Sequence, residues 1–242
     1  MTHLRAAVRF MTVLPAGPAT AFDAAAMVPW FPVVGLLLGG ILAGADALAS
    51  RWWDPAIVAA LDVVLLACLT GAFHLDGLAD TADGLFSHRP RERVLEIMKD
   101  SRIGSMGVVA LTAVLALKWA AVAALADHRA LLLLIVPAYA RGGILFAMRR
   151  LPYGRPDGGT GLAFFSRRPA VGAFWALGAT VLGSLALGPA AVAVNAAFAL
   201  TVGAVIAFYR RQLGCVTGDM LGAMIEVTEA ALFLIAATGG GR

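Results

Sequence analysis

The chain has 242 residues, of which 60% are hydrophobic and only 14% are charged, and its formal net charge is +4. Soluble domains carry roughly 25% charged residues, so this chain has too little charge to cover a water-facing surface. The composition excludes a soluble globular domain, a disordered chain and a nucleic-acid-binding protein. It favours a single membrane-embedded domain over residues 1–242.

The first element expected along the chain is a short amphipathic helix. Residues 1–14 carry Arg5 and Arg9 among apolar side chains and contain no sustained apolar run. They are therefore not typical of a cleavable signal peptide. We expect this helix to lie in the membrane interface, with Phe10 and Met11 among its apolar anchors.

Seven later segments are long and apolar enough to cross a bilayer, which requires about 20 predominantly apolar residues. They span residues 27–49, 55–73, 103–126, 130–148, 171–187, 189–208 and 220–238. The expected fold is an all-α polytopic membrane bundle of about seven transmembrane helices, with six to eight compatible with the sequence. Oligomeric state stays open, and a homo-oligomer is compatible with these features.

The distribution of positive charge indicates the orientation in the membrane. With the N-terminus inside, the inner segments hold 14 Lys and Arg residues and the outer segments hold three. Positive residues concentrate on the cytoplasmic side of membrane proteins. We therefore expect a multi-pass protein of the cytoplasmic (inner) membrane, with its N-terminus and its active-site face in the cytoplasm, because the inner loops hold nearly all the candidate reactive groups.

The densest group of polar residues follows the second predicted span. If residues 73–84 are helical, Asp76, Asp80 and Asp83 fall within about 60° of one another on one face, and His74 lies on the opposite side. Carboxylate oxygens that share a face suit Mg²⁺, with Mn²⁺ as the alternative. His74 is either a hydrogen-bonded interfacial histidine or a general base.

A basic segment leads into the third predicted span. Lys99 and Arg102 are three residues apart, so on a helix they share a face that could hold phosphate oxygens. Ser101 and the following glycines could open a helix N-terminus whose free N–H groups favour an anion. Basic residues beside a span are equally expected from topology alone, and spacing does not decide between the two.

Several ionisable residues fall inside predicted spans, where such groups face a cavity or a partner. Arg141 and Glu226 lie at a matching depth, about 10 Å from the inner side at 1.5 Å per residue. We expect Arg141 to pair with Glu226 or to reach a substrate phosphate. Asp62 and Lys118 match at about 10–12 Å from the outer side, which predicts a structural ion pair.

Aligned carboxylates beside basic residues at a membrane boundary suit metal-assisted transfer on a diphosphate. Three classes of protein remain open on this evidence. They are a membrane phosphotransferase that moves a substituted phosphoryl group from a nucleotide diphosphate to an alcohol, a prenyltransferase with Asp-rich motifs, and a cation- or proton-coupled transporter. The charges gather at one face instead of lining a path across the bilayer, which disfavours the transporter.

The chain resembles the adenosylcobinamide-GDP ribazoletransferases, also called cobalamin synthases. The resemblance is carried by residues 9–15, 31–35, 96–104, 217–223 and, most specifically, by residues 74–84 with the sequence HLDGLADTADG. These stretches extend from the N-terminus to the last span. The motif of the CDP-alcohol family carries an Arg that residues 74–84 lack, so that family fits less well.

The resemblance implies an Mg²⁺-dependent membrane enzyme acting on adenosylcobinamide-GDP and α-ribazole or its 5′-phosphate. The ribazole 3′-hydroxyl would attack the phosphorus that bears the cobinamide, and GMP would leave. Asp219 would complete the metal shell or act as general base, and spacing does not decide which. The expected site comprises a metal set (Asp76, Asp80, Asp83), a phosphate set (Lys99, Ser101, Arg102, Arg141), and His74 and Asp219. The inner loop 149–168, with Asp157 and Thr160, either covers the site or is a solvated connection.

Overall fold

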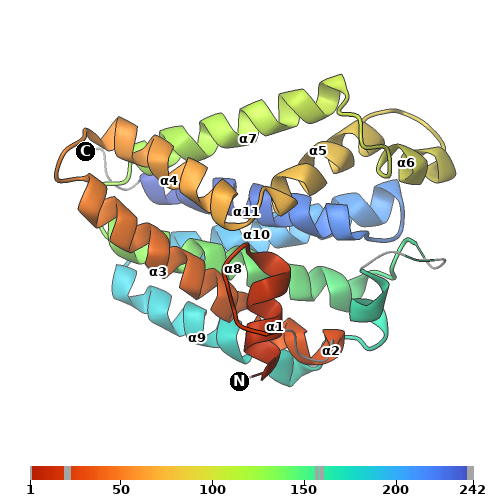
Figure 1. Cartoon of the computed structure of the whole chain (residues 1–242), viewed down its shortest axis with the longest axis horizontal. Helices are drawn as coiled ribbons and strands as arrows, with labels where there is room; N and C mark the ends of the chain where they lie inside the picture. The colour runs from red at the N-terminus through yellow and green to blue at the C-terminus, as the bar shows by residue number, and fades with distance from the viewer. Residues whose placement is uncertain (1, 19–22, 156–157, 159–160, 239–242) are drawn as a thin grey trace.

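The protein is an all-α membrane protein in a computed structural model that describes residues 2–18, 23–155, 158 and 161–238. Five long helices form the body of the bundle (Figure 1): α3 (Phe31–Ala49), α7 (Ser105–Ala123), α8 (Arg129–Arg150), α10 (Ala190–Gln212) and α11 (Gly218–Ala237). The remaining helices are α1 (Thr2–Met11), α2 (Ala24–Met27), α4 (Pro55–Leu69), α5 (Phe73–Leu85), α6 (Arg91–Ile97) and α9 (Trp175–Ser184). Four 3₁₀ turns accompany them: η1 (Val28–Trp30), η2 (Leu162–Phe165), η3 (Val171–Phe174) and η4 (Leu185–Leu187).

The predicted all-α polytopic architecture is confirmed. Among the described residues, five stretches are long and apolar enough to cross a membrane, namely Ala24–Ala49, α7, α8, α10 and α11. The α4–α5 pair makes a sixth if it counts as one span, although the two helices meet at an 89° bend. The predicted span at residues 171–187 is a shorter apolar stretch that begins and ends in 3₁₀ turns.

The long helices run side by side, so the connections between them gather at two ends of the molecule. At one end lie the α3–α4, α7–α8 and α9–α10 connections and the end of α11 (Figure 1). At the other end lie the end of α5, α6, the segment after α8 and the α10–α11 turn. The second end carries the basic loops that the sequence assigns to the cytoplasm.

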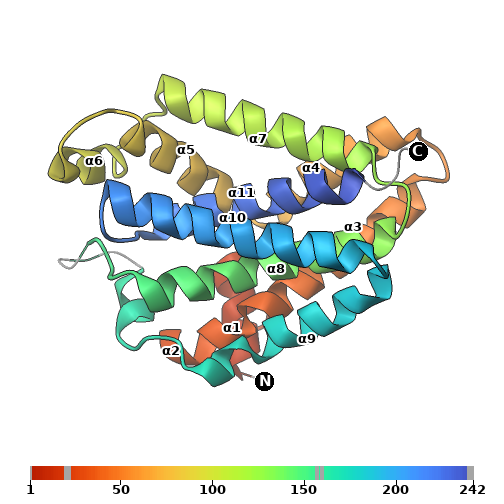
Figure 2. The same ribbon diagram turned by 180° about the vertical axis from the view of Figure 1, so that it is seen from behind.

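Helix α8 is the centre of the bundle. Most of its residues are buried, whereas α7 and α10 expose most of theirs. Figure 2 shows α10 running the length of the opposite face, outside α8. The first helix, α1, runs across the long helices and buries Ala7, Val8 and Met11 against them (Figure 1). The predicted amphipathic helix is confirmed, and its place in the membrane interface stays a prediction.

Helices α3 and α8 pack with their backbones in direct contact. Gly35 and Gly39, four residues apart on α3, face the stretch of α8 around Pro137. A Cβ on Gly39 would lie 2.6 Å from the Leu133 carbonyl oxygen and still closer to that of Leu134. Small residues at this spacing let membrane helices approach closely. Close packing matters there because lipid is itself apolar, so the hydrophobic effect does not drive helices together. This contact fixes α8 relative to the N-terminal half.

We predict that Gly39→Ala destabilises the protein by about 1–3 kcal/mol, because the added methyl group must push the α8 backbone away. The matched control is Gly44→Ala, on the same helix, where a Cβ meets nothing within 4 Å. Thermal unfolding in detergent measures both. Equal unfolding temperatures for the two variants would contradict the close α3–α8 packing.

Candidate active site

The α4–α5 break places the acidic helix at the end of the bundle. Helix α4 ends at Leu69, and the Thr70 hydroxyl donates to the carbonyls of Leu66 and Ala67, at 3.1 Å each. Gly71 and Ala72 then adopt left-handed backbone conformations, with φ of 59° and 57°. These two residues produce the 89° bend, and α5 starts from it in a new direction towards the basic loops (Figure 1).

The acidic row lies on α5, as the sequence predicts. Asp76 is exposed, whereas Asp80 is half-buried. Asp80 lies within electrostatic range of Asp76, Asp83, Asp219 and Arg155, so four carboxylates share this region with one guanidinium. Within the described part of the chain, no three acidic, His or Cys side chains are already gathered around one point where a metal ion would sit. The predicted metal set stays a prediction.

Asp83, the last residue of the acidic row, contacts the start of α7. Its carboxylate accepts hydrogen bonds from the backbone N–H groups of Gly104, at 2.7 Å, and Gly107, at 2.8 Å. These N–H groups belong to the first turn of a helix, where no intrahelical acceptor exists and a negative charge is favourable. The helix N-terminus that the sequence predicts as an anion site therefore receives the chain's own carboxylate.

The basic segment differs from the prediction. Helix α6 ends at Ile97 and α7 begins at Ser105, so Lys99, Ser101 and Arg102 lie in a connection and share no helical face. The reason is local, because Arg102 turns back to pair with Asp100 at 2.6 Å. Arg102's hydrogen bonds lower the pKa of Asp100 to about 2. Lys99, Ser101 and Arg102 are all exposed at the loop end of the bundle.

Asp219 faces α5 across a tight helix crossing. A Cβ on Gly77 would lie 2.7 Å from the Asp219 carbonyl oxygen, and a Cβ on Gly222 would lie 3.2 Å from the Cα of His74. The two glycines therefore allow α5 and α11 to touch along their backbones. This crossing brings Asp219, at the start of α11, next to the acidic row.

Arg155 pairs with Asp219 at 2.6 Å and also donates to the Met98 carbonyl at 3.2 Å. It comes from the inner loop after α8, and part of that loop therefore lies over the acidic residues. Asp157 and Thr160 of the same loop lie outside the described residues. The sequence offered only a weak signal for Arg155, one basic residue among many in the inner loops.

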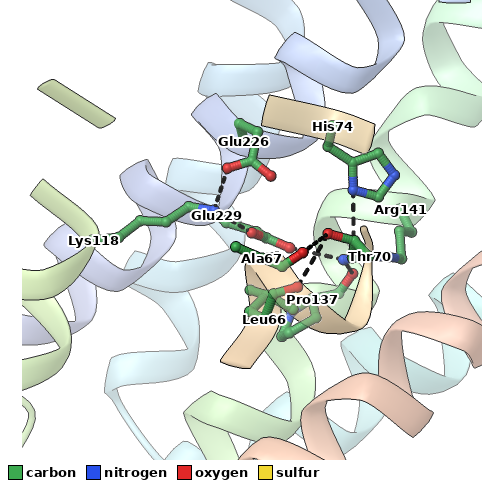
Figure 3. A network of polar contacts seen from close by, with 9 residues as sticks. All are labelled: Leu66, Ala67, Thr70, His74, Lys118, Pro137, Arg141, Glu226 and Glu229. Carbon is green, nitrogen blue, oxygen red and sulfur yellow. Dashed lines mark hydrogen bonds and ion pairs between the residues drawn. The ribbon is translucent and has the colours of Figure 1, made fainter. Parts of the chain in front are cut away.

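Behind the acidic row lies a buried network of charged side chains from three helices (Figure 3). Lys118 of α7 pairs with Glu226, at 2.6 Å, and with Glu229 of α11. Arg141 of α8 pairs with Glu229 at 2.7 Å and also donates to the Pro137 carbonyl at 3.0 Å. All four side chains are nearly or completely buried, so water cannot solvate them. The two cations and the two anions neutralise one another instead.

Two predicted ion pairs are wrong. Arg141 pairs with Glu229, one helical turn further along α11, and Glu226 is taken by Lys118. Lys118 accordingly does not meet Asp62. Matching depth was the only basis for those pairs, and depth leaves the rotation of each helix about its axis undetermined.

Asp62 instead pairs with Arg129 at the start of α8, at 3.3 Å, and Arg129 also holds Asp46 at 2.6 Å. This second cluster lies at the opposite end of the bundle from the acidic row. It joins α3, α4 and α8, and so has a structural role.

His74 lies between the network and the acidic row. Its Nδ1 is 3.5 Å from the Arg141 guanidinium, and its side chain is 1% exposed (Figure 3). The network thus includes the predicted site residues Arg141 and His74, while Asp76, Asp80, Asp83 and Asp219 lie at the loop end. Glu229, which the sequence analysis did not single out, is the residue that connects both cations; its spacing of three from Glu226 was the available signal.

The comparisons with known proteins agree on one family. The profile of a family described as cobalamin-5-phosphate synthase matches residues 3–237. A relative from Bradyrhizobium diazoefficiens is 42% identical over 98% of this chain and 94% of its own length. A second from a Synechococcus strain is 38% identical over 96% and 95%. A third from Chlorobaculum tepidum is 36% identical over 98% and 95%. All three are named adenosylcobinamide-GDP ribazoletransferase. No solved structure matches the chain.

We predict that Asp83→Ala lowers stability by about 1–2 kcal/mol, because two N–H groups at the start of α7 lose their acceptor. Asp76→Ala, an exposed substitution on the same helix, is expected to leave stability unchanged or slightly higher, since it relieves repulsion of Asp80. Thermal unfolding of the purified variants compares the two. If the Asp83→Ala and Asp76→Ala proteins were equally stable, the Asp83 carboxylate would not stabilise the start of α7.

We predict that Glu229→Gln costs roughly 3–5 kcal/mol of stability, because it leaves Lys118 and Arg141 with one buried carboxylate between them. Glu96→Gln is the control, since it removes the exposed pair that Arg93 and Glu96 form at 2.7 Å. Surface pairs contribute about 0–1 kcal/mol. If both variants unfold at the same temperature, the network does not stabilise the bundle.

Proposed function

The chain belongs to the cobalamin-5-phosphate synthase family of cobalamin-biosynthesis transferases, and from this premise we propose that it joins adenosylcobinamide-GDP to α-ribazole or its 5′-phosphate. The ribazole 3′-hydroxyl oxygen forms a bond to the phosphorus that bears the cobinamide. The bond from that phosphorus to the bridging oxygen of the diphosphate breaks, and GMP leaves. Among the three classes left open by the residues, family membership selects the phosphotransferase.

The single observation that supports a phosphoryl-transfer site here is the surplus of negative charge around Asp80. Four carboxylates lie near one guanidinium, so the region favours a cation. The atoms that this region offers to a metal ion are carboxylate oxygens, hard ligands that suit Mg²⁺ and also Mn²⁺. Mg²⁺ is usually bound through one or two carboxylates together with substrate phosphates, so a complete protein cage is not required.

We propose Asp76 and Asp80 as the residues that hold Mg²⁺, with Asp83 fixing the row against α7. When bound, the metal ion would offset the charge of the diphosphate oxygens. Lys99, Ser101 and Arg102 would contact phosphate oxygens, because all three are exposed at the same end, to the solvent from which the nucleotide arrives. Arg141 is buried and bound to Glu229, so we assign it a supporting part behind the site.

Asp219 is our candidate for the general base toward the 3′-hydroxyl. Its carboxylate is held by Arg155 and by the Thr217 hydroxyl at 3.4 Å, contacts that fix its orientation beside the acidic row. A base must lie within hydrogen-bond reach of the proton it accepts. With the acceptor ribose beside Asp219, the proton would pass to this carboxylate as the oxygen attacks phosphorus.

We propose that the protein lies in the cytoplasmic membrane with this end of the bundle facing the cytoplasm. The support is the excess of Lys and Arg in the loops that gather here, which are expected on the cytoplasmic side. This orientation exposes the acidic row to the nucleotide substrates.

We predict that purified protein releases GMP from adenosylcobinamide-GDP only when α-ribazole and Mg²⁺ are both present. Asp80→Asn should reduce the rate by roughly 100-fold, because it removes a metal-binding charge. Asp54→Asn is the matched control, an exposed residue before α4 at the opposite end. GMP release without α-ribazole would indicate a hydrolase, and an Asp80→Asn enzyme with normal turnover would refute the metal assignment.

A further inference from the structure

An aromatic cavity opens beside the start of α5, and about 50 Å³ of it admits the centre of a water-sized sphere. Five phenylalanines line it, from α1, α3, α5 and η2: Phe10, Phe31, Phe73, Phe164 and Phe165. Phe10 contacts two of the other rings, since its centroid lies 4.7 Å from that of Phe164 and 5.8 Å from that of Phe73. Such walls suit a flat apolar group better than a charged one.

His74 supplies a buried polar group to this cavity. Arginine has only donors, so the contact of the Arg141 guanidinium at 3.5 Å makes Nδ1 of His74 the acceptor. In the neutral imidazole the proton is then on Nε2. Within the described residues, Nε2 has no hydrogen-bond partner although the side chain is 1% exposed. A buried donor without an acceptor is costly, which points to an acceptor supplied by a ligand.

The cavity borders the acidic site. Gly218 lines it, and the next residue is Asp219. A ligand that places a flat ring in the cavity and extends past Gly218 would therefore have its remaining atoms beside Asp219.

We propose, building on the proposed function, that this cavity binds the heteroaromatic base of the acceptor nucleoside, with His74 Nε2–H donating to the free ring nitrogen of the base. The base of ribazole is a dimethylated benzimidazole. It is flat and apolar, and one ring nitrogen bears the ribose while the other keeps its lone pair. Aromatic walls with one donor match that pattern. A lipid chain would fill the same walls but would leave the His74 donor without an acceptor.

The test compares α-ribazole with the matched nucleoside of dimethylindole, in which a C–H replaces the free ring nitrogen. We expect the wild-type protein to use the indole nucleoside about 10- to 100-fold less efficiently in kcat/KM, mainly through KM, because the donor stays unpaired. In His74→Leu this discrimination should fall to about 2-fold or less. His74→Gln, whose amide can donate, should retain part of it. His3→Leu, an exposed histidine of α1, should leave it unchanged.

The outcomes separate this proposal from the one on which it rests. Equal use of the two nucleosides by the wild-type protein would overturn the base-binding role of His74 while the transfer reaction stands. Discrimination that persists in His74→Leu would place the donor elsewhere and would also overturn it. No GMP release with either nucleoside would mean that the proposed function itself has failed.

Discussion

The requirement that buried charges be paired organises this membrane protein. Lys118, Arg141, Glu226 and Glu229 come from α7, α8 and α11 and have almost no access to water. An unpaired charge there would be strongly unfavourable, so the three helices must present these side chains to one another. The pairing thereby restrains the rotation of each helix about its axis. His74 touches the same network through Arg141, which extends the restraint to α5.

The acidic end of the bundle depends on that arrangement through backbone contacts. Once α5 and α11 are held together, the close approach at Gly77 sets Asp219 beside the acidic row. The bond from Asp83 to the start of α7 holds the other end of α5. The surplus of carboxylates around Asp80 is thus maintained by contacts on both sides. A rigid framework of this kind is what a phosphoryl-transfer site needs, since its catalysis relies on positioning and charge.

Local features of the site were predictable to the extent that they depend on helical spacing. The helix at residues 73–85 and the common placement of its three Asp residues follow from the sequence pattern. The helical face assigned to Lys99 and Arg102 did not form, because the Asp100–Arg102 pair ends the helical path after α6. A local side-chain hydrogen bond and a continued helix are alternative structures for the same segment. The free-energy difference between them is small, and the spacing of residues along the sequence does not reveal it.

The sequence by itself determined the all-α class, the apolar stretches, the position of the acidic row and the family. Hydropathy and helical periodicity carry that information because each acts within one segment. Only the tertiary structure decided that Arg141 pairs with Glu229, that Lys118 turns away from Asp62, and that α4 and α5 meet at 89°. These features depend on how helices distant in sequence pack and on how each is rotated about its axis. The depth of a residue along one helix does not determine that rotation.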